Sequence, residues 1–224
     1  MSQRDTPTRM KVPFSDLIQH FDGLATQSIE FSDDNFGVWD RDMHQEVLNF
    51  ADLSDTSSLL ELGCGTGRFT HLLGPVVQRA VAIDASPRML QQARARDPKH
   101  PHVLWLNADM RTPPETTGID TIVMCHAVRY LDKDERTQLF ETLAGRLPVS
   151  GLLIIGDLLW SMPPDMVEGA EDWLDSKHAH VLMADKVEKE LQSVGFDTFV
   201  KRMHPAISVI RAAKLPPQNS QSRG

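Results

Sequence analysis

The stretch that decides the fold reads LLELGCGTGRFT, from Leu59 to Thr70. It joins an apolar run to glycines at three alternate positions, Gly63, Gly65 and Gly67. An apolar run that leads into a glycine-rich turn is typical of a buried strand followed by a ligand-binding loop and a helix. The sequence therefore predicts that a nucleotide-like ligand binds beside this loop.

Two phosphate-binding loops can be compared with this pattern. A triphosphate loop needs a lysine directly after its last glycine, and Arg68 follows Gly67 here. A dinucleotide loop spaces its glycines as G-x-G-x-x-G, and the third glycine here comes one residue early. The pattern excludes a triphosphate loop and weakens the case for a dinucleotide. Closely spaced glycines still allow unusual backbone angles and a close approach of a ligand to the main chain.

Size and composition predict an ordinary globular protein. The chain has 224 residues, of which 41% are hydrophobic and 24% charged, enough for one domain with a real core. A formal net charge of −8 disfavours a nucleic-acid partner, because such proteins usually present a basic face. No run reaches the ~18 apolar residues of a membrane helix, and residues 1–14 lack the apolar core of a signal peptide. The two cysteines, Cys64 and Cys125, are expected to be reduced thiols. We predict a cytoplasmic protein without a membrane partner.

Apolar runs alternate with helical patterns after residue 57. Strands are predicted at 58–62, 79–84, 102–109, 119–125 and 151–158, with two more within 199–212. Helices are predicted within 14–55 and at 67–76, 86–96, 132–147 and 184–196. The helix at 86–96 has a standard start, with Ser86 as N-cap and Pro87 as its first residue. Strands apolar on both faces, separated by helices, indicate an α/β fold with a parallel sheet covered on both sides.

Ligands of such sheets bind beyond the carboxyl ends of the strands. The glycine loop follows the first strand of the alternating region, at the position that this rule requires. We predict a single domain over 13–214, with a helical cap at 13–55 and a substrate-lid insertion at 159–182. Residues 1–12 and 215–224 are predicted to be disordered tails, because they are polar or rich in proline and amides.

Four motifs in order carry a family resemblance: ELGCGTG, VAIDASPRML, NADM and IDTIVMCHAVRYL. Together they resemble the class I methyltransferases that use S-adenosylmethionine, over residues 58–158. The resemblance implies a Rossmann-like, doubly wound, mostly parallel seven-stranded sheet with an antiparallel C-terminal strand. It also implies S-adenosyl-L-methionine as cofactor and S-adenosyl-L-homocysteine as product.

Strand-end residues match the groups of that cofactor. Asp84 ends the second strand, where a carboxylate can accept two hydrogen bonds from a ribose diol. Asp109 can accept from an adenine amine, and Met110 offers a backbone N–H and an apolar side chain to the ring. The alternatives are a solvated strand-end acid at Asp84 and a turn cap at Asp109.

The resemblance adds further contacts. It implies that Glu61 lies near the ammonium group of the cofactor, directly or through water, although Glu61 can instead hold the glycine loop. It implies that the backbone carbonyl of Cys125 meets the same ammonium and that the N-terminal helical segment closes over the cofactor. Trp39 is our candidate to reach the site from that segment, with ordinary helix packing as the alternative. The predicted cofactor-binding residues are Trp39, Glu61, Gly63, Cys64, Gly65, Gly67, Asp84, Ala85, Asp109, Met110 and Cys125.

Fewer sequence signals indicate the residues that would bind the methyl acceptor. His126 follows the fourth strand and is our candidate general base, because histidine titrates near neutral pH. A hydrogen-bonded structural role is the alternative. Trp160, Met162 and Trp173 are the predicted substrate-binding residues of the lid, with local core packing as the alternative. His178 and His180 are poorly spaced for a metal, so no metal is predicted.

The acceptor is predicted to be a small molecule, because the chain is acidic and CHAV stands where base or amide methyltransferases carry Asn/Asp-Pro-Pro-Tyr/Phe. An RNA or protein acceptor, a non-catalytic cofactor-binding protein and an NAD-dependent oxidoreductase are the alternatives. These residues specify neither the methylated atom nor the oligomeric state.

Overall fold

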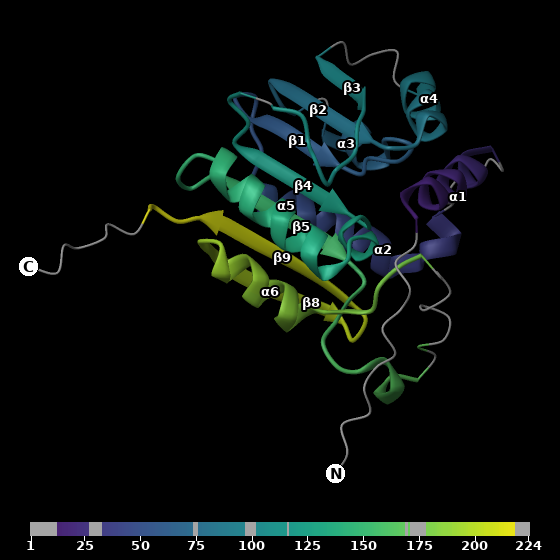
Figure 1. Ribbon diagram of the computed structural model, residues 1–224, viewed down its shortest axis with the longest axis vertical. Coiled ribbons are helices and arrows are strands. Elements are labelled where there is room, and N and C mark those ends of the chain that lie inside the picture. Colours follow the sequence, from purple (N-terminus) through teal and green to yellow (C-terminus); the bar gives the residue numbers. More distant parts are fainter. Residues whose placement is uncertain are drawn as a thin grey trace, which may run out of the picture.

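The computed structural model of the chain describes residues 13–26, 33–73, 76–96, 102–115, 117–168, 170 and 178–217. The strands are β1 (Ser58–Leu62), β2 (Arg79–Asp84), β3 (Val103–Asn107), β4 (Thr121–Cys125), β5 (Leu152–Asp157), β8 (Phe196–His204) and β9 (Ile207–Lys214). Within these residues they form one sheet of seven strands in the order β3-β2-β1-β4-β5-β9-β8 (Figure 1). The pairs among β1 to β5 are parallel, whereas β9 runs antiparallel to both β5 and β8.

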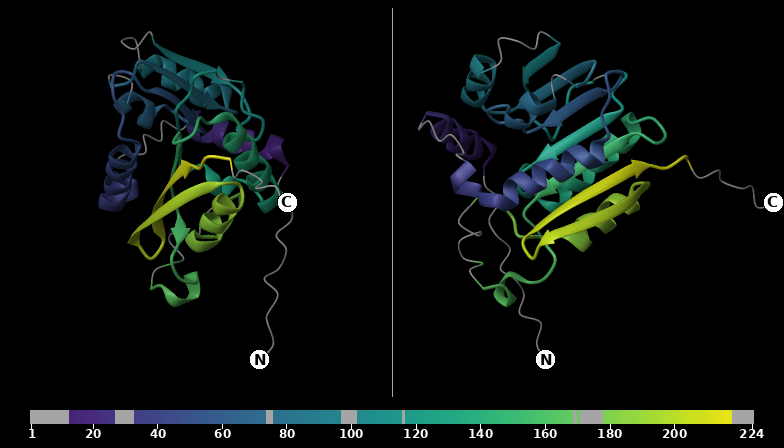
Figure 2. Two further views of the ribbon diagram at one scale, coloured as in Figure 1. Left: turned by 90° about the vertical axis from the view of Figure 1, so that its left-hand side faces the viewer. Right: turned by 180° about the vertical axis from the view of Figure 1, so that it is seen from behind.

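Helices cover both faces of the sheet. They are α1 (Phe14–Thr26), α2 (Asp33–Ala51), α3 (Arg68–Leu73), α4 (Pro87–Arg96), α5 (Lys133–Arg146) and α6 (Ala184–Ser193). Helix α2 lies in front of the sheet in the right-hand view of Figure 2, with α5 and α6 on the opposite face. Leu59 joins one buried cluster with Met43 of α2, and Leu60 joins the other with Phe140 of α5. Neighbouring residues of a strand thus enter different cores, which is why the strands read as continuous apolar runs.

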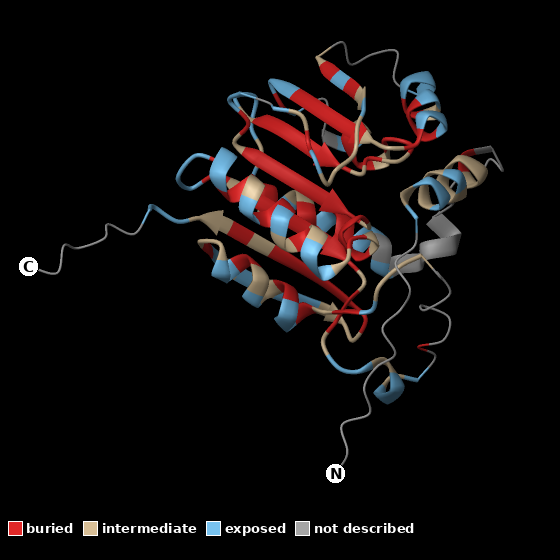
Figure 3. Ribbon diagram, in the orientation of Figure 1, coloured by how far each residue is buried: buried red, intermediate tan, exposed pale blue. Residues whose placement is uncertain are grey.

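The predicted architecture is confirmed, and the elements differ from prediction mainly at their ends. Strands β3, β4 and β5 are shorter than predicted, and β8 begins earlier, at Phe196, because Gly195 turns the chain there with φ +93. Figure 3 shows β1 and β4 buried along their whole length. Gly74 and Pro75, the predicted end of the third helix, lie outside the described residues, as do 1–12 and 218–224 of the predicted tails.

Helix starts follow from capping side chains. The Ser86 hydroxyl accepts from the Met89 N–H at 3.1 Å, which confirms Ser86 as the N-cap of α4. Asp132 caps α5 through a reciprocal pair of bonds with Glu135. Helix α4 therefore begins three residues after β2 ends, whereas α5 begins after the short helix that follows β4. No helix within the described ranges is long and apolar enough to cross a membrane.

Candidate functional site

The glycine loop joins β1 to α3 at the carboxyl edge of the sheet. Gly63, Gly65 and Gly67 have φ angles of +74°, +54° and +76°, in the left-handed region that favours glycine. The N–H groups of Gly63 and Cys64 both donate to the Ile83 carbonyl at 2.9 Å. The loop is therefore anchored to β2, next to Asp84.

The three glycines meet different surroundings. A Cβ on Gly63 would lie 2.9 Å from the Ala127 Cβ, and one on Gly67 would lie 2.5 Å from Cη2 of Trp105. A Cβ on Gly65 would meet nothing within 4 Å. Packing thus requires glycine at 63 and 67, whereas Gly65 leaves open space in which a ligand can approach the backbone.

Asp84 connects the loop to the end of β2. Its carboxylate accepts from the N–H groups of Gly65 and Ser86, each at 2.8 Å. The Asn107 side-chain amide donates to the carbonyls of Asp84 and Ala85 at 2.9 Å, so both residues are held in place from β3. Burial raises the pKa of Asp84, and its two backbone donors oppose this rise.

Glu61 lies beneath the loop and is 2% exposed. It accepts a hydrogen bond from the Thr70 hydroxyl of α3. Burial raises the pKa of Glu61 to about 8, with a further contribution from the Asp84 charge. Burial also raises the pKa of the Cys64 thiol, with the Glu61 and Asp84 charges adding to the rise, and such a thiol is a poor nucleophile.

The residues after β3 form a small polar cluster. The Asp109 carboxylate accepts from Nε and Nη2 of Arg111 at 2.8 and 2.6 Å, and Arg111 also pairs with Glu135 at 3.2 Å. Part of the accepting capacity of Asp109 is therefore used within the protein. Met110 lies beside the loop, because its Sδ would be 3.8 Å from a Cβ on Gly63.

Helix α1 crosses the carboxyl edge of the sheet (Figure 1). Phe14 at its start lies under the Arg111 guanidinium, 3.6 Å from ring centroid to Cζ. Phe21 meets Tyr130 edge to face with ring centroids 5.1 Å apart, and Asp22 accepts from the Ser86 hydroxyl. One helix thus contacts residues that follow β2, β3 and β4.

Trp39 lies elsewhere than the sequence predicts. Its ring packs against His204, the last residue of β8, with centroids 5.1 Å apart. Strand β8 is four positions from β1 in the sheet order, a separation of about 19 Å at ordinary strand spacing. The structure therefore does not bring Trp39 to the glycine loop, because α2 carries it toward β9 and β8. In the structure it is α1 that crosses the edge beside the loop.

His126 follows Cys125 at the end of β4. It has φ +53, an uncommon value for a residue other than glycine, and its N–H donates to the Gly156 carbonyl at 2.9 Å. Its Nδ1 lies 3.9 Å from an Asp157 oxygen, and its ring centroid lies 5.8 Å from that of His44 on α2. The backbone therefore fixes an imidazole at the carboxyl edge between β4 and β5. Cys125 itself is buried in the core.

Sequence reasoning missed Asp157, Arg129 and His44 at this end of the site. Asp157 is 0% exposed and ends β5 in the sequence IIGDL, so the strand-end logic applied to Asp84 would have found it. Arg129 lies in the short helix η1 (Val128–Tyr130), with Nη1 3.6 Å from Asp157. Nothing in the sequence around His44 marks it, because only the fold brings α2 beside His126.

The predicted lid segment, 159–182, begins with strand β6 (Leu159–Trp160), contains the short helix η2 (Pro164–Met166), and ends within strand β7 (Leu182–Met183). Strands β6 and β7 pair in parallel. Trp160 is 1% exposed and belongs to the same core cluster as Met43 and Val209. This corrects the prediction that Trp160 binds substrate, because its indole fills the core. Met162 is 39% exposed, and Trp173 lies outside the described residues.

Replacing Trp160 by alanine is expected to lower the free energy of unfolding by ~3–5 kcal/mol, because it leaves a large cavity in the core. Denaturant unfolding followed by circular dichroism measures this change. Met162→Ala is the control from the same segment, with an expected change within about 0.5 kcal/mol. Wild-type stability in Trp160→Ala would contradict the core placement.

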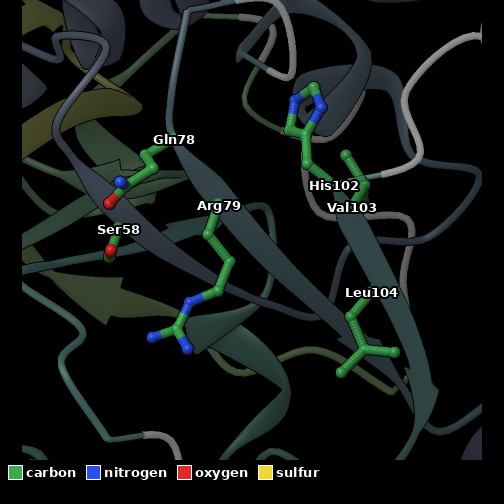
Figure 4. Close-up of a pocket in the computed structure, with 6 residues that line it drawn as sticks. All are labelled: Ser58, Gln78, Arg79, His102, Val103 and Leu104. Carbon is green, nitrogen blue, oxygen red and sulfur yellow. The ribbon is translucent and has the colours of Figure 1, made fainter.

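A cavity of about 610 Å³ lies at the opposite edge of the sheet (Figure 4). Its lining comes from the first residues of β1, β2 and β3 and from residues just before them: Ser58, Gln78, Arg79, His102, Val103 and Leu104. The labelled side chains do not converge on one point, and Arg79 already donates to the Thr117 carbonyl at 2.6 Å. The site that we describe is instead at the carboxyl edge, where ligands of parallel sheets bind.

Comparisons with known proteins find methyltransferases. A family model described as "Methyltransferase domain" matches residues 59–151. Nodulation protein S of Bradyrhizobium diazoefficiens is 32% identical over 46% of this chain and 49% of that protein. Trans-aconitate 2-methyltransferase of Escherichia coli is 30% identical over 62% of this chain and 49% of that protein. The chain spans about half the length of these curated relatives.

A solved structure extends the likeness to nearly the whole fold. It is that of N-methyltransferase NodS from Bradyrhizobium japonicum in complex with S-adenosyl-L-homocysteine. It superposes with a TM-score of 0.71 at 21% identity, covering 88% of this chain and 97% of that chain. At this identity the likeness establishes the fold and its strand order.

Proposed function

The chain belongs to the class I S-adenosylmethionine-dependent methyltransferases, and from this premise we propose that it transfers a methyl group from S-adenosylmethionine to a small-molecule acceptor. The open space at Gly65 carries the proposal, since it lies beside a carboxylate at the end of β2. The names of the curated relatives and the cofactor product bound to NodS support it.

The residues at the carboxyl edge fit this cofactor. Asp84, held by two backbone N–H groups, would accept from the ribose diol, with Ala85 beside it. Met110 would lie against the adenine. Asp109 would accept a hydrogen bond from the adenine amine through carboxylate lone pairs that do not already accept from Arg111. Glu61 and the Cys125 carbonyl would receive the ammonium group. Gly63, Cys64 and Gly67 shape the loop around these groups.

S-adenosylmethionine supplies, when bound, a methyl group on a cationic sulfur, and the acceptor's lone pair bonds to that carbon while the methyl–sulfur electron pair stays on sulfur. The protein's task is then to align the acceptor and to exclude water. Helix α1 would serve as the cap, because it crosses this edge and contacts residues after β2, β3 and β4. His126 would remove a proton from a neutral acceptor, since its imidazole lies at the end of β4.

Asp84→Asn is expected to weaken S-adenosylhomocysteine binding by ~10–100-fold, because the amide loses the charge that strengthens its hydrogen bonds to the ribose. Isothermal titration calorimetry measures the dissociation constant. Asp120→Asn is the matched control: Asp120 also accepts from a backbone N–H, that of Ser58 at 3.0 Å, but at the amino edge of the sheet. The affinity of Asp120→Asn for S-adenosylhomocysteine is expected to equal that of the wild type.

Failure of the wild-type chain to bind either S-adenosylmethionine or S-adenosylhomocysteine would reject the proposal. Binding without transfer of radiolabel to any metabolite would instead favour a non-catalytic binding protein. A loss of NADH binding in Asp84→Asn would favour the oxidoreductase alternative, because the same carboxylate would then hold a dinucleotide ribose.

A further inference from the structure

Arg129 and Arg136 are both buried, yet their guanidinium groups have different surroundings. They are 9% and 6% exposed. Arg136 binds both carboxylate oxygens of Glu190, through Nε at 2.9 Å and Nη2 at 3.0 Å, and its Nη1 donates to the Leu131 carbonyl at 2.8 Å. Every nitrogen of that guanidinium therefore has an acceptor, and its role is structural.

Arg129 has no such set of acceptors. Its Nη2 donates to the Tyr130 hydroxyl at 3.2 Å, but Nε and Nη1 are buried without a hydrogen-bond partner. Asp157 lies 3.6 Å from Nη1, beyond hydrogen-bond distance, and its own oxygens accept from the N–H groups of Arg129 and Leu158. A buried donor without an acceptor loses its hydrogen bonds to water and gains none in the fold, so two such donors on one cation are unusual in a native structure.

The guanidinium keeps its charge in this environment. Burial lowers the pKa of Arg129, but the Asp157 carboxylate and the Tyr130 contact outweigh this and leave the pKa above its ordinary value. A charged guanidinium with adjacent N–H donors matches the two oxygens of a carboxylate, which bind it in parallel.

The surroundings place this cation on the acceptor side of the site. Arg129 follows β4, and its carbonyl accepts from the His180 N–H at 2.7 Å. His178 also buries an Nδ1 without a hydrogen-bond partner, and its ring meets that of His20 on α1 with centroids 4.5 Å apart. The next residue of α1, Phe21, meets Tyr130. Helix α1 thus contacts His178 and Tyr130, the neighbour of Arg129, and Arg129 lies three residues after His126 in the sequence.

We propose that Arg129 binds a carboxylate group of the methyl acceptor, so that the acceptor is a small carboxylic acid that enters beneath α1. The proposal rests on the proposed function and names the substrate class of that site. The carboxylate would accept from Nη1 and from the remaining hydrogen of Nη2 at the end of the Arg129 guanidinium, because Nε and Nη1 point to different sides and cannot both meet one carboxylate. His178 would offer a further hydrogen bond from Nδ1. An acidic protein thereby recruits an anion through one buried cation rather than through a basic surface.

The test uses the purified full chain and a panel of small mono-, di- and tricarboxylic acids, each paired with its uncharged amide. Each compound is titrated calorimetrically with and without saturating S-adenosylhomocysteine, and label transfer from radioactive S-adenosylmethionine is measured in parallel. We expect at least one acid to bind and to accept label, and its amide to do neither.

Arg129→Lys and Arg129→Met are expected to weaken binding of that acid and to lower kcat/KM by at least about tenfold. Lysine keeps the charge but loses the paired donors, which makes it the variant of choice if methionine prevents folding. Affinity for S-adenosylhomocysteine is expected to stay within about twofold of wild type in both, since the side chain of Arg129 interacts with Tyr130 and Asp157 rather than with the glycine loop. Retained affinity confirms that each variant is folded.

The inference would be overturned by acids that bind no better than their amides, or by acid binding that is unchanged in Arg129→Lys. Label transfer only to uncharged acceptors would do the same while leaving the proposed function intact. If the wild-type chain does not bind S-adenosylhomocysteine, the proposed function is rejected. The acid titrations in the absence of S-adenosylhomocysteine still test the role of Arg129, so the two failures can be told apart.

Discussion

Gly65→Val is expected to abolish S-adenosylhomocysteine binding in a folded protein, with a loss of affinity of ~1000-fold or more, or about 4 kcal/mol. The added side chain would occupy the open space beside Asp84 in which a ligand meets bare backbone. Gly65 has φ +54, so a branched residue there also strains the main chain, at a cost of about 1–3 kcal/mol. Calorimetry gives the affinity, and denaturant unfolding gives the stability.

Gly118→Val separates the strain from the steric block. Gly118 has φ +75, and a Cβ there would meet only Nη2 of Arg79, at 3.8 Å, near the amino edge of the sheet. A similar loss of stability is expected in this control, with wild-type affinity for S-adenosylhomocysteine. Gly65→Val with unchanged affinity would show that the ligand does not approach the loop at this residue.

The fold was predictable where local signals agree with the global arrangement. The apolar runs at β1, β2 and β5 are buried on both faces, so their composition alone marks them as central strands. Ser86-Pro87 and the acids after Leu131 mark helix starts through the backbone donors that they satisfy. The early start of β8 was not predicted, because the strand begins directly after Gly195 and no other turn residue marks the boundary.

The site was predictable on the cofactor side and less so on the acceptor side. Glycines and strand-end acids act through the backbone to which they are joined, so their positions in sequence fix their positions in space. Trp39, Trp160 and Arg129 act through side chains whose surroundings come from distant elements. Trp160 looked like a ligand-binding aromatic because it follows a strand, but the pairing of β6 with β7 places it in the core.

Stability of the ligand-free protein is expected to fall as the pH rises from about 4.5 to about 8, because Glu61 has a pKa of about 8 in the fold against 4.5 as its ordinary value. The folded chain keeps this proton while the unfolded chain releases it. The contribution of Glu61 is therefore complete below the lower pKa and is lost as the pH passes through the higher one. For a pKa shift of this size, the resulting loss in the free energy of unfolding is up to about 5 kcal/mol.

Glu61→Gln removes the titration while keeping the shape and an acceptor for Thr70. The difference in unfolding free energy between wild type and Glu61→Gln, measured from pH 5 to 8.5, isolates the contribution of Glu61. We expect the wild type to lose stability relative to the variant as the pH rises. A constant difference would show that Glu61 is already ionised in the fold at pH 5.

Cofactor binding should reverse this protonation, because an ammonium group near Glu61 favours the carboxylate. At pH 7 the free protein holds the proton, so S-adenosylhomocysteine binding is expected to release up to about one proton per chain. Calorimetric titrations in two buffers of different ionisation enthalpy measure this number, and Glu61→Gln is expected to release correspondingly less. Equal proton release by the two proteins would mean that Glu61 holds the loop through Thr70 without meeting the ammonium, since only a carboxylate that changes its protonation can report the approach of that charge.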